Sequence, residues 1–115
     1  MNFWRKEWNW KLMLRQPEFI TREMVEEVKP EVRANKRLDE ALNVEFEAYD
    51  EGLSAQVMHI GPFEEEGATI ARLHQFIQEN GYEPHGLHHE IYLTDARKVP
   101  PEKLRTIIRQ QIRKA

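Results

Sequence analysis

The stretch Gly86-Leu87-His88-His89-Glu90-Ile91-Tyr92-Leu93-Thr94-Asp95 decides how the rest of the sequence is interpreted. Its two aliphatic residues, Ile91 and Leu93, alternate with polar residues, which is typical of a β-strand with one apolar face. Glutamate is disfavoured in strands, so Glu90 needs an explanation. Either it is solvated or paired with a basic side chain, or it lines a concave ligand site together with the phenol of Tyr92.

Composition limits the classes of protein to which the chain can belong. Its 115 residues predict a single domain, 1–115, with its own hydrophobic core. The absence of cysteine excludes disulfides, cysteine-ligated metals and a thiol nucleophile. No apolar run is long enough for a signal peptide or a membrane span, so we expect a cytoplasmic protein without a membrane partner. The formal charge of −3 predicts no nucleic-acid partner.

Histidines and tryptophans supply further candidate residues. The five histidines follow no known zinc-binding spacing, and the sequence predicts neither a metal site nor a cofactor. His59 lies just before Gly61-Pro62, where we expect a hydrogen-bonded residue at the rim of the core rather than a metal ligand. Trp8 and Trp10 either belong to such a rim or form a stacking surface for a flat ligand, and the sequence leaves both interpretations open.

Alternation, helical spacing and turn residues predict the order of the elements. They are a strand at 8–15, a helix at 21–29, a polar connector at 34–43, a hairpin of strands 44–49 and 53–60, a helix at 67–80, a strand at 88–95, a helical turn at 101–104 and a strand at 104–112. Pro30 is expected to end the first helix. The apolar stripe of the second helix is expected to cover Ile91 and Leu93, which would leave the Glu90 face pointing away from that helix.

Two segments of the chain have the same shape. Lys11–Gln16 and Arg105–Gln110 each begin with a basic residue, continue with a largely apolar stretch and end in Arg-Gln. The other motifs are His59-Ile60-Gly61-Pro62-Phe63, Glu79-Asn80-Gly81-Tyr82, His88–Asp95, Pro101-Glu102-Lys103-Leu104, Arg109-Gln110 and the Trp-x-Trp run at 8–17. In combination they resemble the GyrI-like small-molecule-binding domain over most of the chain from Trp8 onward.

This resemblance implies an α+β fold with an antiparallel sheet and helices on one face. The family's fold is two strand-helix-strand-strand units (SHS2-like), with a ligand groove on the face of the sheet opposite the helices. The chain begins too late to contain the family's first strand and helix, so the first copy is expected to be incomplete. Either a second copy of the chain completes the groove in a homodimer, or the chain is a truncated member of the family with an open and inactive pocket. We expect the homodimer, because an uncovered tryptophan face is an aggregation hazard.

The resemblance also implies a function. The family is similar to the effector-binding domains of multidrug-responsive transcription regulators, in which a glutamate on a central strand faces the groove, and Glu90 matches that position. A flat, cationic or amphipathic small molecule is the expected ligand. The candidate ligand-binding residues are Glu90, Tyr92, Trp8, Trp10, His88 and Phe63. Two alternatives stay open: a hydrolase of cyclopropane-bearing DNA-alkylating compounds, with Glu90 as the catalytic residue, and a dimerisation or interaction module.

Overall fold

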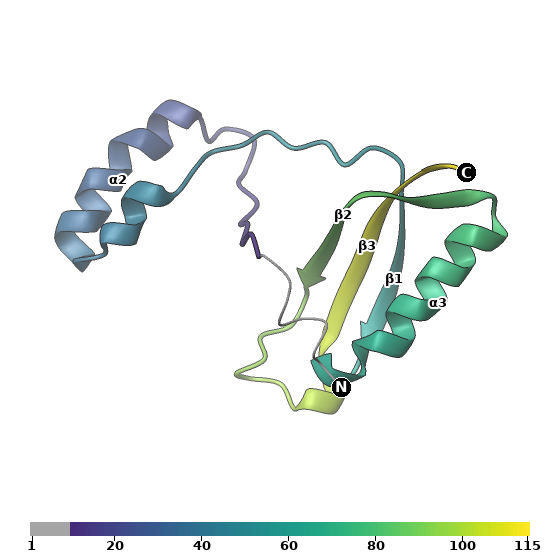
Figure 1. The fold of residues 1–115 in the computed structure, drawn as a ribbon. Coiled ribbons are helices and arrows are strands. Elements are labelled where there is room, and N and C mark those ends of the chain that lie inside the picture. The colour runs from purple at the N-terminus through teal and green to yellow at the C-terminus, as the bar shows by residue number, and fades with distance from the viewer. Residues whose placement is uncertain (1–9) are drawn as a thin grey trace. The chain divides into compact units, whose positions relative to one another are not determined.

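An antiparallel sheet and a long helix make up the part of the chain that carries Glu90. In the computed structural model, which describes residues 10–115, this unit spans Glu51–Ala115 and is separate from the unit formed by residues 10–50. Its elements are β1 (Ser54–Ile60), α3 (Glu66–Glu79), β2 (Tyr82–Tyr92) and β3 (Arg105–Lys114), and the strand order is β1-β3-β2 (Figure 1). The predicted α+β class and the strand-helix-strand-strand order are confirmed.

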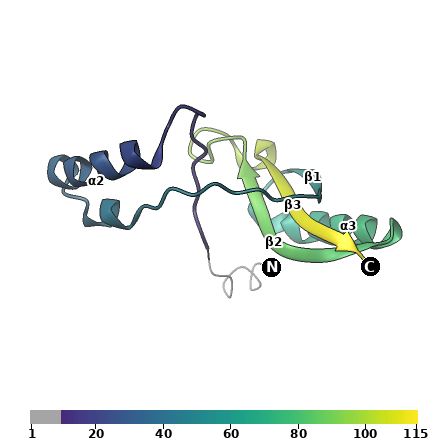
Figure 2. The same cartoon turned by 90° about the horizontal axis from the view of Figure 1, so that it is seen from above.

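The core of this unit lies between α3 and one face of the sheet (Figures 1 and 2). Leu73 and Ile77 of α3 are buried against Ala55 of β1 and Ile108 of β3. The helix ends where Asn80 donates its side-chain amide to the carbonyl oxygen of Phe76. Gly81 follows with a φ of 82°, a value that favours glycine, so the predicted helix at 67–80 is confirmed to within one residue.

The face of the sheet on which Glu90 lies differs from the prediction. In the antiparallel register Glu90 is opposite Ile108, and residues opposite each other in a ladder point to the same face. Since Ile108 is the fully buried residue under α3, Glu90 also lies on the helix side of the sheet. Ile91 pairs with Ile107 and lies on the opposite face, where Leu93 is 44% exposed. The prediction that the helix covers Ile91 and Leu93 is wrong, because the core uses the apolar residues of β1 and β3 instead.

Strand β2 also differs in its extent and position. It runs from Tyr82 to Tyr92 instead of 88–95, and its pairing with β3 is shifted between Pro84 and His88. Gly86, with a φ of 83°, lies in this irregular stretch, and a Cβ atom there would collide with the side chain of Gln111. Within the described sheet β2 is an edge strand, so Glu90 is not on a central strand as the resemblance implied.

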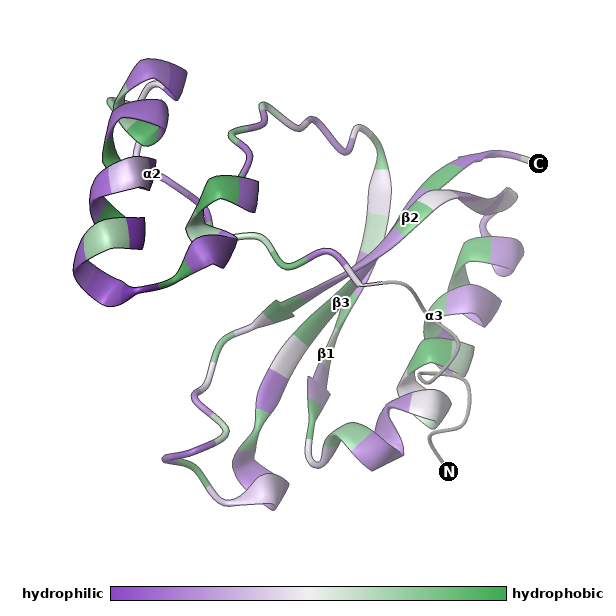
Figure 3. Ribbon diagram, turned by 60° about the vertical axis from the view of Figure 1, so that its left-hand side comes forward, coloured by the Kyte–Doolittle hydropathy of each residue, from purple (hydrophilic) through white to green (hydrophobic). Residues whose placement is uncertain are grey.

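The unit of residues 10–50 contains α2 (Arg22–Lys36) and a short 3₁₀ helix (Asp39–Asn43). Thr21 caps α2 by accepting a hydrogen bond from the backbone N–H of Met24 at 3.2 Å. The helix continues through Pro30, so the prediction that it ends at residue 29 is wrong. Proline removes its own N–H donor, but its fixed φ is helical, so the remaining hydrogen bonds carry the helix to Lys36. Hydrophilic and hydrophobic residues alternate along α2 (Figure 3).

The strands expected at 8–15 and 44–49 do not form in the described part of the chain. Residues 10–15 and 44–50 have no ladder partner among residues 10–115, although Lys11 and Glu47 form an ion pair at 2.9 Å. Alternation of apolar and polar residues supplies a face for a strand but no partner to pair with. The helical turn predicted at 101–104 is confirmed as the 3₁₀ helix Pro101–Lys103.

Candidate functional site

The carboxylate of Glu90 is the centre of the candidate site. Its side chain is 2% exposed, although β2 is an edge strand of the described sheet. Tyr92 donates its hydroxyl to Oε1 at 3.1 Å, and Nε2 of His88 lies 3.0 Å from Oε2. The three residues are spaced two apart along the strand and so lie on one face. Hydrogen bonds to a carboxylate are stronger than those between neutral groups, which explains how the charge is accommodated at this depth.

An aromatic pair borders this carboxylate. Phe63 lies in a 3₁₀ turn (Phe63–Glu65) just before α3 and meets Tyr92 edge to face, with 5.7 Å between ring centroids. Tyr92 is 47% exposed, so its ring connects the buried carboxylate with the surface. Four of the residues predicted for the site therefore lie together: Phe63, His88, Glu90 and Tyr92.

The other two residues predicted for the site are tryptophans near the start of the chain, Trp8 and Trp10. Trp8 lies outside the residues that the structure describes. Trp10 belongs to the unit of residues 10–50 and is 49% exposed. The stacking role of both residues stays a prediction.

A second imidazole lies near the cluster on the helix side. Burial lowers the pKa of His74 in α3, and the nearby charge of His88 lowers it further. His74 directly follows the buried Leu73 in the helix and is itself partly buried. Its electrostatic link to His88 depends on β2 passing beneath the helix and could not be read from the spacing.

Two deeply buried polar residues escaped the sequence analysis. Glu66, in the first turn of α3, is 0% exposed, and Thr106 of β3 is 1% exposed. Glu66 follows two other glutamates, and acidic residues at the start of a helix ordinarily complement its dipole from an exposed position. A signal was present, because Glu66 precedes the buried Leu73 and Ile77 by seven and eleven residues, which places all three on one helical face.

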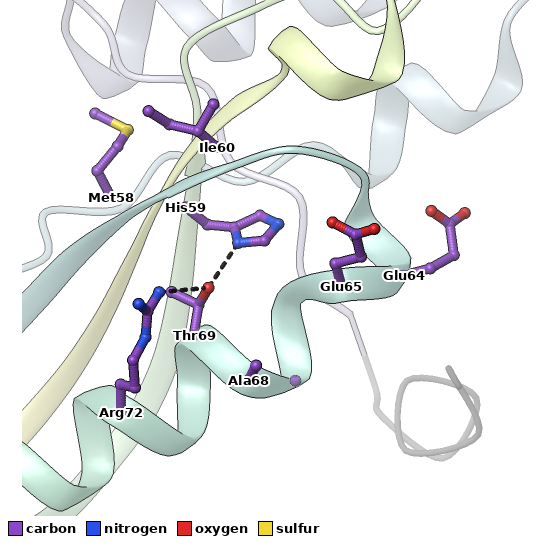
Figure 4. Close-up of a pocket in the computed structure, with 9 residues that line it drawn as sticks. Met58, His59, Ile60, Glu64, Glu65, Ala68, Thr69 and Arg72 are labelled. Atoms are coloured by element: carbon purple, nitrogen blue, oxygen red, sulfur yellow. Dashed lines mark hydrogen bonds between the residues drawn. The ribbon is translucent and has the colours of Figure 1, made fainter.

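His59 has the structural role that the sequence predicted. Its Nδ1 lies 2.7 Å from the Thr69 hydroxyl, and its Nε2 lies 2.9 Å from the carbonyl oxygen of Pro62. Because a carbonyl only accepts, Nε2 carries a proton, and in the neutral ring Nδ1 accepts from Thr69. Arg72 donates to the same hydroxyl at 3.2 Å. His59, Thr69 and Arg72 border a shallow hollow of about 810 Å³ between β1 and α3 (Figure 4). It lies on the edge of the described sheet opposite that of Glu90.

The face of the sheet away from α3 carries a separate ionic cluster. Arg109 donates to Oε1 of Glu51 at 2.7 Å, and Nδ1 of His89 lies 3.1 Å from the same oxygen. Burial acts to raise the pKa of Glu51, but the hydrogen bonds from Arg109 and His89 outweigh it and hold that pKa below its usual value. This cluster is built for charge balance within the protein.

The described range, residues 10–115, offers neither a metal-binding cluster nor a membrane-crossing helix. That range contains no group of three or more histidine or acidic side chains arranged to hold a metal ion. Its helices are all too short or too polar to cross a membrane.

Comparison with known proteins places the chain in a family. The model of the GyrI-like small molecule binding domain matches residues 8–113. No curated protein matches the sequence. Among solved structures, a hydrolase from Listeria innocua is 40% identical with a TM-score of 0.77, and the match covers 86% of this chain and 52% of that protein. An uncharacterized conserved protein from Listeria innocua is 42% identical with a TM-score of 0.79, and the match covers 86% of this chain and 50% of that one.

The chain thus spans about half the length of the solved structures that it matches. The family model, in contrast, covers nearly all of it, from the Trp-x-Trp run to the end of β3. The chain belongs to the family of GyrI-like small-molecule-binding domains.

Proposed function

We propose that this protein binds a flat, cationic or amphipathic small molecule, with the carboxylate of Glu90 as the anchoring charge. The observation that carries the proposal is the depth of that carboxylate, which is 2% exposed and held by the side chains of Tyr92 and His88. Membership of a small-molecule-binding family supports a ligand in general. The cationic character of the ligand is inferred from the charge of Glu90.

Electrostatics favours a cation at this position. Two opposite charges attract more strongly where water is excluded than at the surface, provided that the geometry repays their desolvation. Phe63 and the half-exposed ring of Tyr92 offer apolar area on which a flat ring system can stack. An amphipathic ligand would satisfy both features, with its charge toward Glu90 and its rings against the aromatic pair.

We further propose that the working form is a homodimer in the cytoplasm, in which each chain is one domain. The solved relatives are about twice as long as the matched region, so a second copy would supply a comparable amount of structure. In this arrangement Trp8 and Trp10 would add stacking area to the site. Light scattering after gel filtration tests this point: a mass of two chains supports it, and a monomer that still binds ligand contradicts it.

Binding of acridine orange, a flat cationic dye, tests the proposed site. We expect its fluorescence polarisation to rise on binding, and Glu90→Gln to weaken the affinity by about tenfold or more because a hydrogen-bonded charge is lost. Glu102→Gln is the control, since Glu102 is an exposed glutamate in the 3₁₀ helix before β3. Equal affinity of the wild type and Glu90→Gln contradicts the anchoring role. A dimer that binds no dye would favour an interaction module instead.

Hydrolysis of a strained ring is the second candidate function, because solved relatives are described as hydrolases. In that reaction a water oxygen bonds to a carbon of the cyclopropane, and a carbon–carbon bond of the ring breaks. The released electron pair passes into the conjugated system of the substrate and is protonated, while Glu90 accepts a proton from the water. Turnover of a cyclopropane-bearing alkylating compound, lost in Glu90→Gln, would favour this function, whereas binding without turnover would favour the binding module.

A further inference from the structure

The first turn of α3 brings a second carboxylate to the interface that holds Glu90. Phe63, three residues before Glu66, contacts Tyr92 on β2. Thr69, three residues after it, is hydrogen-bonded to His59 on β1. The start of the helix therefore crosses the sheet from β2 to β1, and Glu66 lies between these two contacts with its side chain fully buried.

The residue beneath this crossing is Thr106 on the central strand. It is opposite His59 on one side and Tyr92 on the other, so the three side chains form a row on the helix face of the sheet. Because Glu66 lies midway in the chain between Phe63 and Thr69, which contact the outer two, we expect its side chain over the middle one. Glu90 is two residues from Tyr92 on the same face and thus borders the same point.

The hydroxyl of Thr106 is the independent sign of a ligand. The residue is 1% exposed, and its Oγ1 has no hydrogen-bond partner within the described range. Buried polar groups in folded proteins nearly always have a partner, and an unpaired one calls for an explanation. A polar group of a bound molecule would provide such a partner, and the register places Thr106 opposite Tyr92, the residue that donates to Glu90.

We propose that Glu66 and Thr106 complete the Glu90 site as additional hydrogen-bond acceptors, so that the site selects cations with amino N–H groups over cations in which those groups are fully alkylated. This inference rests on the proposed function and names its ligand class. A primary amino or amidinium group presents several donors and can bond to the two carboxylates and the hydroxyl together. A dialkylated nitrogen presents no donor and leaves Thr106 unpaired.

Two dyes with the same ring system and charge separate these cases. Proflavine carries two primary amino groups on the acridinium ring, and acridine orange carries two dimethylamino groups in the same positions. We expect the wild-type protein to bind proflavine more tightly. Glu66→Gln and Thr106→Val should each weaken proflavine binding by about tenfold, as loss of a hydrogen bond to a charged group does. Thr106→Val should leave acridine orange binding nearly unchanged, whereas Glu66→Gln, which also removes a charge, should weaken acridine orange binding by less than it weakens proflavine binding.

Controls distinguish ligand binding from a structural role. Thr106→Ser keeps the hydroxyl and should keep the preference for proflavine. Glu64→Gln changes an exposed acid two residues before Glu66 and should bind both dyes as the wild type does. Thermal unfolding of Thr106→Val should show an unchanged or higher melting temperature, because an unpaired buried hydroxyl is removed. A melting temperature that falls together with the affinity for both dyes would overturn the proposal in favour of a packing role.

The remaining outcomes separate this inference from the proposed function. If Glu90→Gln weakens both dyes while Glu66→Gln and Thr106→Val bind proflavine as the wild type does, the Glu66–Thr106 inference is wrong and the Glu90 anchor stands. If the wild type binds neither dye, both the proposed function and the Glu66–Thr106 inference are overturned.

Discussion

Tyr92 donates its hydroxyl to the carboxylate of Glu90 at 3.1 Å from a position only two residues further along the same strand. A donor built into the strand itself keeps its geometry when neighbouring elements move, since the strand spacing fixes it. The buried charge of Glu90 is therefore stabilised from within β2. Removing that donor should affect both folding and binding.

Tyr92→Phe should lower the free energy of unfolding by about 1 kcal/mol, because a hydrogen bond to a charged group is lost at a half-exposed position. The ring remains and keeps its contact with Phe63, so packing is preserved. Urea unfolding measures the change, and acridine orange affinity should fall several-fold in parallel. Unchanged values of both quantities would show that the phenol does not support Glu90.

Ile108→Ala should be among the most damaging core substitutions. Ile108 is 0% exposed and is packed with Leu73 and Ile77 of α3, so truncation leaves a cavity and costs about 2–5 kcal/mol of unfolding free energy. Ile60→Ala is the matched control, because Ile60 is 64% exposed and should change stability by about 0.5 kcal/mol or less. Similar losses in the two variants would contradict the position of the core.

Glu51 should make stability sensitive to acid. Since its pKa is held below the usual value of 4.5 in the folded protein, the unfolded chain binds more protons just below that pH. The stabilisation is present above the unfolded pKa and is lost as the pH falls through the folded one. Melting temperatures of Glu51→Gln should therefore fall less steeply below pH 4.5 than those of the wild type. Arg109→Gln removes the closer donor and should flatten the curve in the same way.

The lowered pKa of His74 predicts that stability also depends on pH in a second range, above that of Glu51. Its pKa is lowered from 6.5 by burial and by the charge of His88, so the folded state again binds fewer protons than the unfolded chain. Stability contributed by the neutral ring is lost as the pH falls below 6.5. His74→Gln should reduce the slope of melting temperature against pH in that range. An unaltered slope would mean that another group causes the pH dependence.

Pro30→Ala tests the continuity of α2. The substitution restores one backbone donor inside the helix and removes a steric conflict that costs up to about 3 kcal/mol. Far-ultraviolet circular dichroism should show equal or greater helix content, and the melting temperature should not fall. A decrease in helix content would mean that the ring of Pro30 stabilises the helix through contacts of its own.

The sequence determined the elements whose signals are local. The helix at 66–79 followed from its apolar spacing and its Asn80-Gly81 stop, and β1 and β3 followed from their alternation and β-branched residues. The grouping of His88, Glu90 and Tyr92 also followed, because residues two apart in a strand share a face whatever lies around it.

Only the tertiary structure decided on which face of the sheet Glu90 lies and which element covers that face. Alternation defines two faces of a strand but does not say which one a helix covers; the register with Ile108 placed Glu90 under α3. The same reasoning explains why the strands expected at 8–15 and 44–49 do not form in the described part of the chain. A strand needs a second segment to pair with, and alternation within one segment does not show whether such a partner exists. It also explains the burial of Glu66 and Thr106, which depends on how α3 packs on the sheet.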